Sequence, residues 1–481
     1  MSTSNYVLTL QLRTEKYQED VLNKRFNKCR NIYNSCISEL HKRYNHMRES
    51  KAYQKNCKYK GKDRNKIFNE LNKQYGLTEY SLYRFVVPMY NYYNIDSKTA
   101  QAMATRSFNA FQKLMFHKSK KVRYIKYNEL YSIEGKTNAQ GIKYRNGVIV
   151  WNKLNIPIVI RKNDEYAQLS LQDRVKHCRI VKKEIKGKIK WYVQLVMEGI
   201  PPKKVNKNTG EIHSIGQDNV GIDIGTRTVA ISSKYDCKLL ELAPNVNNID
   251  KEIKLIQRKM DRSKRVTNLN KYNPNGTVNV KNKDKWIYSN KYLKLKSIYK
   301  ELYRKQSAIR KQDHEVMSNY ILSLGDKFYV ETMSFKGLQA RSKETTVNEK
   351  TGKYNKKKRF GKSLANKAPA MLIEIINRKL KYEGLNINKI NTYKVKASQY
   401  NHFTDEYNKK ELKDRWNKGI NIQRDMYSAF LIMNVNDDLE SINKDKCNET
   451  YDNFKMLHDR EIERLKELKS NGYKLISSMG V

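Results

Sequence analysis

The chain has 481 residues, of which 97 are Lys or Arg and 49 are Asp or Glu, so its formal net charge at pH 7 is +48. This length is enough for two to four domains with sizeable cores. No run approaches the roughly 18 apolar residues of a membrane-spanning helix, and the first residues lack the layout of a signal peptide. These features exclude a membrane or secreted protein, so we expect an intracellular one.

The positive charge is spread through every third of the chain, which indicates large basic surfaces and a polyanionic partner. A nucleic-acid heteroduplex of about 20 base pairs carries roughly 40 phosphates, so the charge is on the scale of a protein that encloses a whole nucleic-acid complex. An AT-rich genome would explain the many Lys and Asn residues, but not the twofold excess of basic over acidic residues.

The first part of the chain begins with a short alternating strand over residues 6–13 and continues with a helix whose apolar residues recur at helical spacing. A second helical zone covers residues 98–118. We assign the apolar stripes to a core and the basic outer faces to nucleic acid, together with the Tyr-rich run 89–94, whose rings could stack on bases. The inward residues are Val21, Phe26, Cys29, Ile32, Tyr33 and Cys36 in the first helix and Ala102, Phe108, Phe111 and Leu114 in the second.

Between residues 120 and 200 the apolar period changes to two, which predicts a small β-barrel or sheet. The expected strands lie within residues 144–152, 154–162, 178–185 and 190–199, and Lys186–Gly187–Lys188 forms a hairpin turn. A polar run with two prolines comes next, so we place a domain boundary near residue 215. The six cysteines form no C-x-x-C pair, which argues against a disulfide framework or a Cys-rich zinc site.

Beyond the boundary, residues 219–236 predict a buried strand, a Gly-Thr turn and a second strand. A helix is expected near 248–265, a mobile surface loop over 266–285, and a long helix over about 289–324 that ends at Gly325. The expected buried seam of the long helix consists of Tyr292, Leu295, Tyr299, Leu302, Ile309, Val316, Tyr320 and Leu324.

Three acids stand at the edges of buried apolar elements: Asp223 in the first strand, Glu331 at the end of a strand over 328–330, and Asp425 at the start of an apolar helix. A buried carboxylate is costly unless a cation or a hydrogen bond compensates it. Three carboxylates are the minimum set for two divalent metal ions that hydrolyse a phosphodiester. Taken singly, Glu331 could be a cap or turn residue and Asp425 could cap its helix.

In this order and context the acids resemble those of the RuvC-type nuclease domain of TnpB proteins and compact type V CRISPR effectors. The resemblance rests on "GIDIG", "VETMSF" and "RDMYSAF" and extends less specifically over nearly the whole chain. It implies that Asp223, Glu331 and Asp425 are the catalytic residues and bind two Mg²⁺ ions, with Mn²⁺ able to substitute.

The resemblance also implies a fold class and a domain plan. The fold would be α/β with helical and β-barrel parts: an RNase H-like RuvC nuclease domain, an N-terminal wedge β-barrel and an inserted helical recognition domain. The expected domains are a wedge β-barrel over 1–12 and 120–214, a helical recognition domain over 13–119, a RuvC-like domain over 215–398 and 422–481, and a target-strand-loading insert over 399–421.

The insert departs from many relatives, which carry a four-Cys zinc knuckle there. Asn401 and Thr404 stand roughly where the first cysteine pair would be, and a lone His402 cannot hold Zn²⁺. We therefore expect no zinc and an insert stabilised by its aromatic residues, which are Tyr400, Phe403, Tyr407 and Trp416.

A basic segment over 336–367 comes directly after Glu331; it is either a solvated loop or a lid over the active site. In the second case Lys356, Lys357, Lys358 and Arg359 would meet phosphate. Arg415 and Arg424 are candidate contacts to the scissile strand.

The function expected from the resemblance is that of an RNA-guided DNA endonuclease whose single RuvC-like site cuts target DNA. Its partners would be a guide RNA, from a transposon end or a CRISPR locus, and target double-stranded DNA that forms an RNA–DNA heteroduplex. The protein would be a monomer, or a homodimer on one RNA, in the prokaryotic cytoplasm, and nucleoid-associated when on DNA.

Two alternatives stay open. One is a catalytically silent RNA-guided repressor on the same scaffold. The more remote one is an actin- or sugar-kinase-type ATPase, whose first phosphate loop also looks like "GIDIGTRTVAIS". The ATPase would need this motif near its N-terminus and a second phosphate loop, and neither is evident.

Overall fold

The structure is a computed structural model in which the chain forms two compact units, Met1–Lys203 and Lys204–Val481. The boundary expected near residue 215 therefore lies inside the second unit, because the polar run after the two prolines belongs to that unit. The structure describes residues 4–205, 209–246, 248–349, 351–355, 357, 360–409, 411, 414–417 and 419–481.

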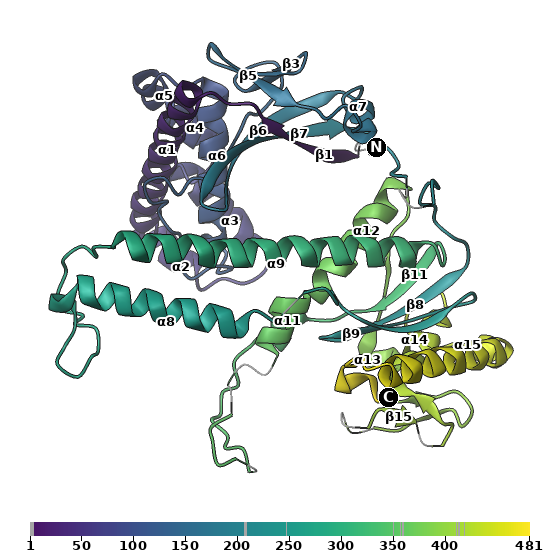
Figure 1. Cartoon of the computed structure of the whole chain (residues 1–481). Helices are drawn as coiled ribbons and strands as arrows, with labels where there is room; N and C mark the ends of the chain where they lie inside the picture. Colours follow the sequence, from purple (N-terminus) through teal and green to yellow (C-terminus); the bar gives the residue numbers. More distant parts are fainter. Residues whose placement is uncertain are drawn as a thin grey trace. The chain divides into compact units, whose positions relative to one another are not determined.

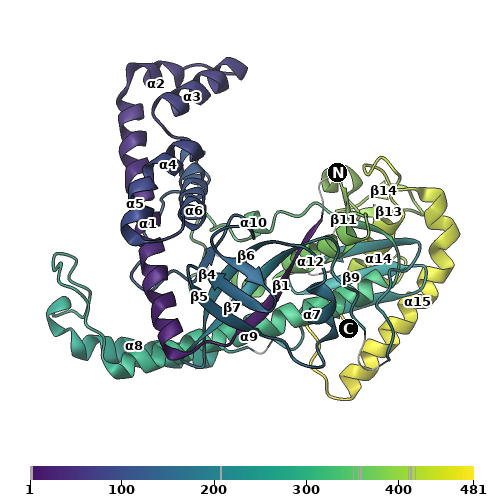
Figure 2. The same ribbon diagram turned by 90° about the horizontal axis from the view of Figure 1, so that it is seen from above.

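The helical part of the first unit is built on α1 (Lys16–Glu49), a 34-residue helix. Its start is fixed by a capping box between Glu15 and Gln18. Its buried stripe includes the predicted Phe26, Cys29 and Ile32. Figure 2 shows α4, α5 and α6 alongside α1, and α2 and α3 at its far end. The shorter helices are α2 (Lys51–Asn56), α3 (Lys62–Gln74), α4 (Glu79–Phe85), α5 (Val87–Tyr93) and α6 (Ser97–Met115).

The sheet of the first unit has seven strands in the order β2-β6-β7-β1-β5-β4-β3, and every neighbouring pair is antiparallel. Of the two predicted alternatives, a barrel or a sheet, the described residues form a sheet that curls into an open half-barrel (Figure 1), which corrects the wedge β-barrel implied by the resemblance. Its two edge strands have only three residues each, which is too little backbone to close the sheet. The elements are β1 (Asn5–Leu12), β2 (Ser132–Glu134), β3 (Lys143–Arg145), β4 (Val148–Trp151), β5 (Leu154–Val159), α7 (Glu165–Ser170), β6 (Val175–Ile185) and β7 (Lys188–Glu198).

The hairpin between β6 and β7 turns where the sequence placed it. Lys186 and Gly187 both have positive φ, 50° and 75°, as the two-residue turns that match strand twist require.

The second unit has a mixed five-stranded sheet in the order β10-β9-β8-β11-β12. β9 is antiparallel to both β8 and β10, whereas β11 runs parallel to β8 and β12. The strands are β8 (Asn219–Ile224), β9 (Thr228–Ser233), β10 (Cys237–Glu241), β11 (Lys327–Glu331) and β12 (Asn388–Ile390).

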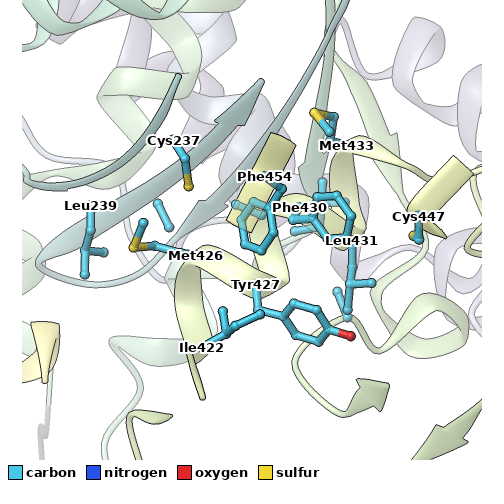
Figure 3. Close-up of a cluster of buried hydrophobic side chains, with 14 of the residues drawn as sticks. Cys237, Leu239, Ile422, Met426, Tyr427, Phe430, Leu431, Met433, Cys447 and Phe454 are labelled. Atoms are coloured by element: carbon cyan, nitrogen blue, oxygen red, sulfur yellow. The ribbon is translucent and has the colours of Figure 1, made fainter. Parts of the chain in front are cut away.

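The two faces of this sheet have separate cores. One face carries Val220, Ile222 and Ile224 and packs on α9 (Asn290–Leu322) and α12 (Pro369–Tyr382). The other face packs on α14 (Arg424–Met433) and α15 (Lys444–Ser470) (Figure 1). In this second core the rings of Phe430 and Phe454 stack with centroids 4.3 Å apart (Figure 3).

Helix α8 (Asp250–Thr267) packs along α9, and the segment that joins them is mostly an exposed loop, as expected, while its mobility stays a prediction. The two ends of the loop are held together, since the buried Asn268 side chain bonds to the backbone of Ile287. The Lys264 ammonium also lies 3.6 Å from the centre of the Trp286 ring. A short helix, η1 (Leu269–Lys271), lies within this segment.

The predicted seam of α9 is wrong at Ile309 and Val316, which are 37% and 63% exposed. Leu324 is buried and Tyr320 packs against the core, as predicted. The helix also buries Gln306, His314 and Met317, which were not predicted. The apolar spacing suggested one continuous stripe, but the face turned to α12 and the sheet is partly polar.

The remaining elements of the second unit are short. They are α10 (Phe335–Leu338), α11 (Gly361–Lys367), α13 (Thr392–Val395), β13 (Tyr400–Asn401), β14 (Glu406–Tyr407), β15 (Trp416–Asn417), β16 (Ile422–Gln423) and η2 (Ser477–Met479). Among the described residues, no helix combines the length and the hydropathy needed to cross a bilayer.

Candidate active site

Asp223 lies near the end of β8, in the middle of the second unit's sheet. Side chains alternate between the two faces of a strand, so Asp223 points to the same face as Gly221, away from the core that Val220, Ile222 and Ile224 form. The face it shares with Gly221 is the one covered by α14. Its side chain is half-buried.

Gly221 lets α14 lie directly against β8. A Cβ at this position would be 2.0 Å from the Ala429 carbonyl oxygen and 2.5 Å from the Met433 backbone nitrogen. At the start of the strand, the Asn219 side chain donates to the Met433 carbonyl at 3.4 Å. Only a residue without a side chain permits this approach. This role was not predicted from the sequence, where its one signal is a glycine two positions before Asp223.

These contacts set the register of α14 along β8. Two strand residues span about 6.6 Å and four helical residues about 6 Å, so the two elements advance almost equally. Met433 lies beside Asn219, and Ala429 lies beside Gly221. Going four more residues back along α14 and two more along β8 places Asp425 beside Asp223.

Glu331 joins them from the neighbouring strand. β11 pairs with β8 in parallel, with Val330 opposite Ile222, so Glu331 comes next, opposite Asp223. Tyr329, two residues earlier on β11, is buried in the core on the α14 face, which places Glu331 on that face too.

The electrostatics agree with this arrangement. Burial raises the pKa of Asp223 well above its usual value, the Asp425 and Glu331 carboxylates raise that pKa further, and Arg424 lowers it. Burial also raises the pKa of Glu331. The structure thus brings the three predicted acids into one electrostatic group, while their role as metal ligands stays a prediction.

The Asp425 carboxylate pairs with two arginines. Arg424 Nε and Nη2 lie 3.2 and 3.1 Å from its Oδ1, and Arg415 Nη1 lies 3.8 Å from its Oδ2. Arg424 is itself held by the carbonyl oxygens of Glu411 and Asp414, at 3.2 and 3.1 Å. The two predicted arginines therefore both lie beside Asp425, Arg415 from the insert and Arg424 from α14.

The cap of α14 is Gln423, whose side chain accepts from the Met426 backbone N–H at 2.8 Å. Asp425 therefore does not cap its helix.

The donor set suits Mg²⁺ in kind, because it consists of carboxylate oxygens from three rigid elements. Among the described residues, the carboxylates of Asp223 and Glu331 accept no hydrogen bond, and Arg424 offsets part of the charge on Asp223. The spacing is wider than one ion requires: in the part of the chain that the structure describes, no three His, Cys, Asp or Glu side chains are close enough to hold a metal ion.

The insert packs through the aromatic residues that the sequence selected. Tyr400 and Tyr407 pair across β13 and β14 with ring centroids 4.9 Å apart. Trp416 donates from Nε1 to the Gly480 carbonyl at 2.8 Å. His402 is fully buried beside Phe403, and its Nδ1 lies 2.6 Å from the Tyr427 hydroxyl. Burial, with Lys444 nearby, lowers the pKa of His402 to about 4.

The structure describes the basic segment over 336–367 only in part. Lys357 is exposed, whereas Lys356, Lys358 and Arg359 lie outside the described residues. The lid and its phosphate contacts stay a prediction.

No protein-family model matches the chain, and neither does any curated protein. Two solved structures that resemble it are of compact type V CRISPR effectors, the class that the motifs resemble. One is the cryo-EM structure of a Cas12f1–sgRNA–target DNA complex, with a TM-score of 0.37 and 11% identity over 89% of this chain and 98% of that one. The other is a CRISPR-Cas12f ternary complex, with a TM-score of 0.28 and 14% identity over 87% and 82%. Likeness at this level does not establish a shared activity.

Proposed function

We propose that this protein is an RNA-guided DNA endonuclease of the TnpB and compact type V effector group, with a RuvC-like, RNase H-like catalytic domain in its second unit. The observation that carries the proposal is the convergence of Asp223, Glu331 and Asp425 from three distant segments onto one face of a mixed sheet. The net charge of +48 supports a nucleic-acid partner.

Asp223, Glu331 and Asp425 would hold two Mg²⁺ ions, with Mn²⁺ able to substitute, and no zinc is required. When bound, Mg²⁺ supplies a Lewis acid and an acidified water for phosphodiester hydrolysis. The chain's own part is to fix the carboxylates on a rigid sheet and helix and to keep the site half-buried. Asp425 must also be released from Arg424 and Arg415 before its oxygens are free to act as ligands.

Arg424 and Arg415 would then contact the phosphates of the scissile strand, because exchanging a carboxylate for a phosphate keeps each guanidinium paired. The insert would thereby couple the arrival of substrate to the freeing of Asp425. Target choice would come from base pairing with the guide RNA, and the protein would act as a monomer or as a homodimer on one RNA.

The test starts with purification of the protein together with the RNA bound in its native cells. Sequencing that RNA defines a matched DNA target, against which cutting is measured with and without Mg²⁺. We expect Mg²⁺-dependent cutting that Asp223→Ala, Glu331→Gln and Asp425→Ala each abolish, while RNA and target binding persist. Equal loss of binding in these variants would show that the acids are structural.

A silent RNA-guided repressor is the second candidate. It is favoured by one observation, the pairing of Asp425 with two arginines in a group too widely spaced for one metal ion among the described residues. Tight, guide-dependent DNA binding by the intact protein, without cutting at any Mg²⁺ concentration, would favour it over the endonuclease.

A further inference from the structure

A basic segment connects α6 to β2 in the first unit and contains neither helix nor strand. We call residues 118–130 the strap. It has five cationic residues and one acidic residue, Glu129. The cationic residues are Lys118, Lys120, Lys121, Arg123 and Lys126.

Two asparagines of α1 hold the strap by its backbone. Asn34 donates from Nδ2 to the Ile125 carbonyl, and the Ile125 N–H donates to Asn34 Oδ1, both at 2.9 Å. Asn27 likewise donates to Asn128 Oδ1 at 2.9 Å and accepts from the Asn128 N–H at 3.2 Å.

The two clamps set the direction of the strap. Asn34 holds Ile125 and Asn27 holds Asn128, so the strap runs antiparallel to α1. It then turns: the Glu129 N–H donates to the Lys126 carbonyl at 3.1 Å, and Asn128 has a φ of 59°. The burial of Leu130, 2% exposed, anchors the end of the strap.

The fixed backbone turns charges and rings outward. Tyr124 and Tyr127 are 53% and 68% exposed, and the Arg30 guanidinium lies 5.7 Å from the centre of the Tyr127 ring. Arg30 steadies that ring while leaving most of it open. In the described part of the chain, none of the four cations Lys120, Lys121, Arg123 and Lys126 takes part in an ion pair, and all four are exposed.

We infer that the strap is a preordered platform for single-stranded nucleic acid: its cations meet the phosphates, and Tyr124 and Tyr127 stack on two unpaired bases. Cations that track a backbone combined with aromatic rings are the means by which proteins hold single strands. A duplex does not fit, because its base faces are already stacked on one another. The inference rests on the proposed function, and it names the part of the chain that would hold an unpaired stretch.

The test measures binding by the full-length chain, free of nucleic acid and without Mg²⁺, using fluorescence anisotropy over a range of salt concentrations. The probes are a labelled 12-nucleotide oligo(U) RNA, the same length of oligo(dT), and a 12-base-pair RNA duplex. Tyr124→Ala and Tyr127→Ala remove the rings, Lys120→Ala with Lys121→Ala removes two charges, and Asn34→Ala releases the backbone while keeping every charge and ring.

Each tyrosine variant should weaken single-strand binding about tenfold without changing its salt dependence. The lysine pair should reduce the slope of log affinity against log salt by about 1.4, since each lost phosphate contact on a single strand removes about 0.7. Asn34→Ala should weaken binding about threefold at an unchanged slope, because the strap must then be ordered on binding. Thermal unfolding establishes that this variant folds.

Tyr473→Ala, at a ring 64% exposed in the other unit, and Lys466→Ala are matched controls and should change nothing. Strap variants that bind oligo(U) and oligo(dT) as the controls do, or that lose duplex binding equally, would overturn the inference. A larger effect on oligo(U) than on oligo(dT) assigns the strap to RNA, and the reverse assigns it to a DNA strand. Because no metal is present, the result is independent of whether the three acids support cleavage.

Discussion

Replacing Asp223 by Asn should make the metal-free protein more stable while abolishing cutting. The change keeps the shape of the side chain and removes a charge that burial and the neighbouring Asp425 and Glu331 carboxylates disfavour. Sites built for catalysis commonly hold such unfavourable groups, so their removal stabilises the fold.

The size of the effect can be worked out from the strand register. Glu331 is opposite Asp223 on the adjacent strand. Neighbouring strands are about 4.8 Å apart, and two like charges at about 5 Å with an effective dielectric constant near 20 repel by about 3 kcal/mol. Attraction to Arg424 offsets part of this, so we expect Asp223→Asn to gain about 1–3 kcal/mol, or about 2–4 °C in Tm for each kcal/mol.

The assay is thermal unfolding of the wild type and the variant, each with and without Mg²⁺, with Asp452→Asn, an exposed acid on α15, as the control. Mg²⁺ at ten times its Kd should stabilise the wild type by about 1.4 kcal/mol and the variant much less. A Tm of Asp223→Asn below that of the wild type would show that the Asp223 charge does not destabilise the metal-free fold. Equal stabilisation of both proteins by Mg²⁺ would show that Asp223 is not a metal ligand.

The packing of the second unit leads to three further predictions. Gly221→Ala places a Cβ 2.0 Å from a carbonyl oxygen of α14, so it should lower the free energy of unfolding by more than about 3 kcal/mol and abolish cutting. Gly419→Ala, where a Cβ would have no atom within 4 Å, is the control and should be nearly neutral. Equal Tm values for the two variants would contradict the register of α14 on β8. The pKa of His402 is about 4 in the folded chain and about 6.5 in the unfolded chain. As the pH falls from about 6.5 to 4, the unfolded chain therefore binds a proton that the folded chain does not bind. The free energy of unfolding should fall by about 3 kcal/mol over this range. His402→Phe should flatten this part of the stability–pH curve, and an unchanged slope would assign the acid sensitivity elsewhere. Arg424→Ala breaks two hydrogen bonds to carbonyl oxygens and should lower the free energy of unfolding by about 2–3 kcal/mol. The Arg415 guanidinium is 3.8 Å from the Asp425 carboxylate, so Arg415→Ala should cost under about 1 kcal/mol. Chemical denaturation that ranks the two variants in the opposite order would contradict these roles.

The sequence predicted the elements that carry the acids because each has a strong local signal. A buried run ends at Glu331, and the apolar helix α14 has Asp425 in its first turn. The alternation of apolar and polar residues in β6 and β7 predicted the two strands, and Lys186–Gly187 predicted the turn between them.

The features that sequence reasoning missed depend on long-range contacts. The close approach of α14 at Gly221 and the bond from Asn268 to Ile287 across the loop need partners that only the fold brings together. The exposure of Val316 and the open edges of the half-barrel were missed because apolar spacing does not specify which neighbour is present. The pairing of Asp425 with Arg415 has no sequence signature, since the two lie on different elements of the insert and the helix.

The most direct test of the central claim is a crystal structure of the protein with its RNA and DNA, grown with Mn²⁺ and measured for anomalous scattering. We expect two anomalous peaks ligated by Asp223, Glu331 and Asp425, with Arg424 and Arg415 moved from Asp425 onto phosphate. Peaks located elsewhere, or no peak beside the three acids when the substrate strand occupies the site, would contradict the claim.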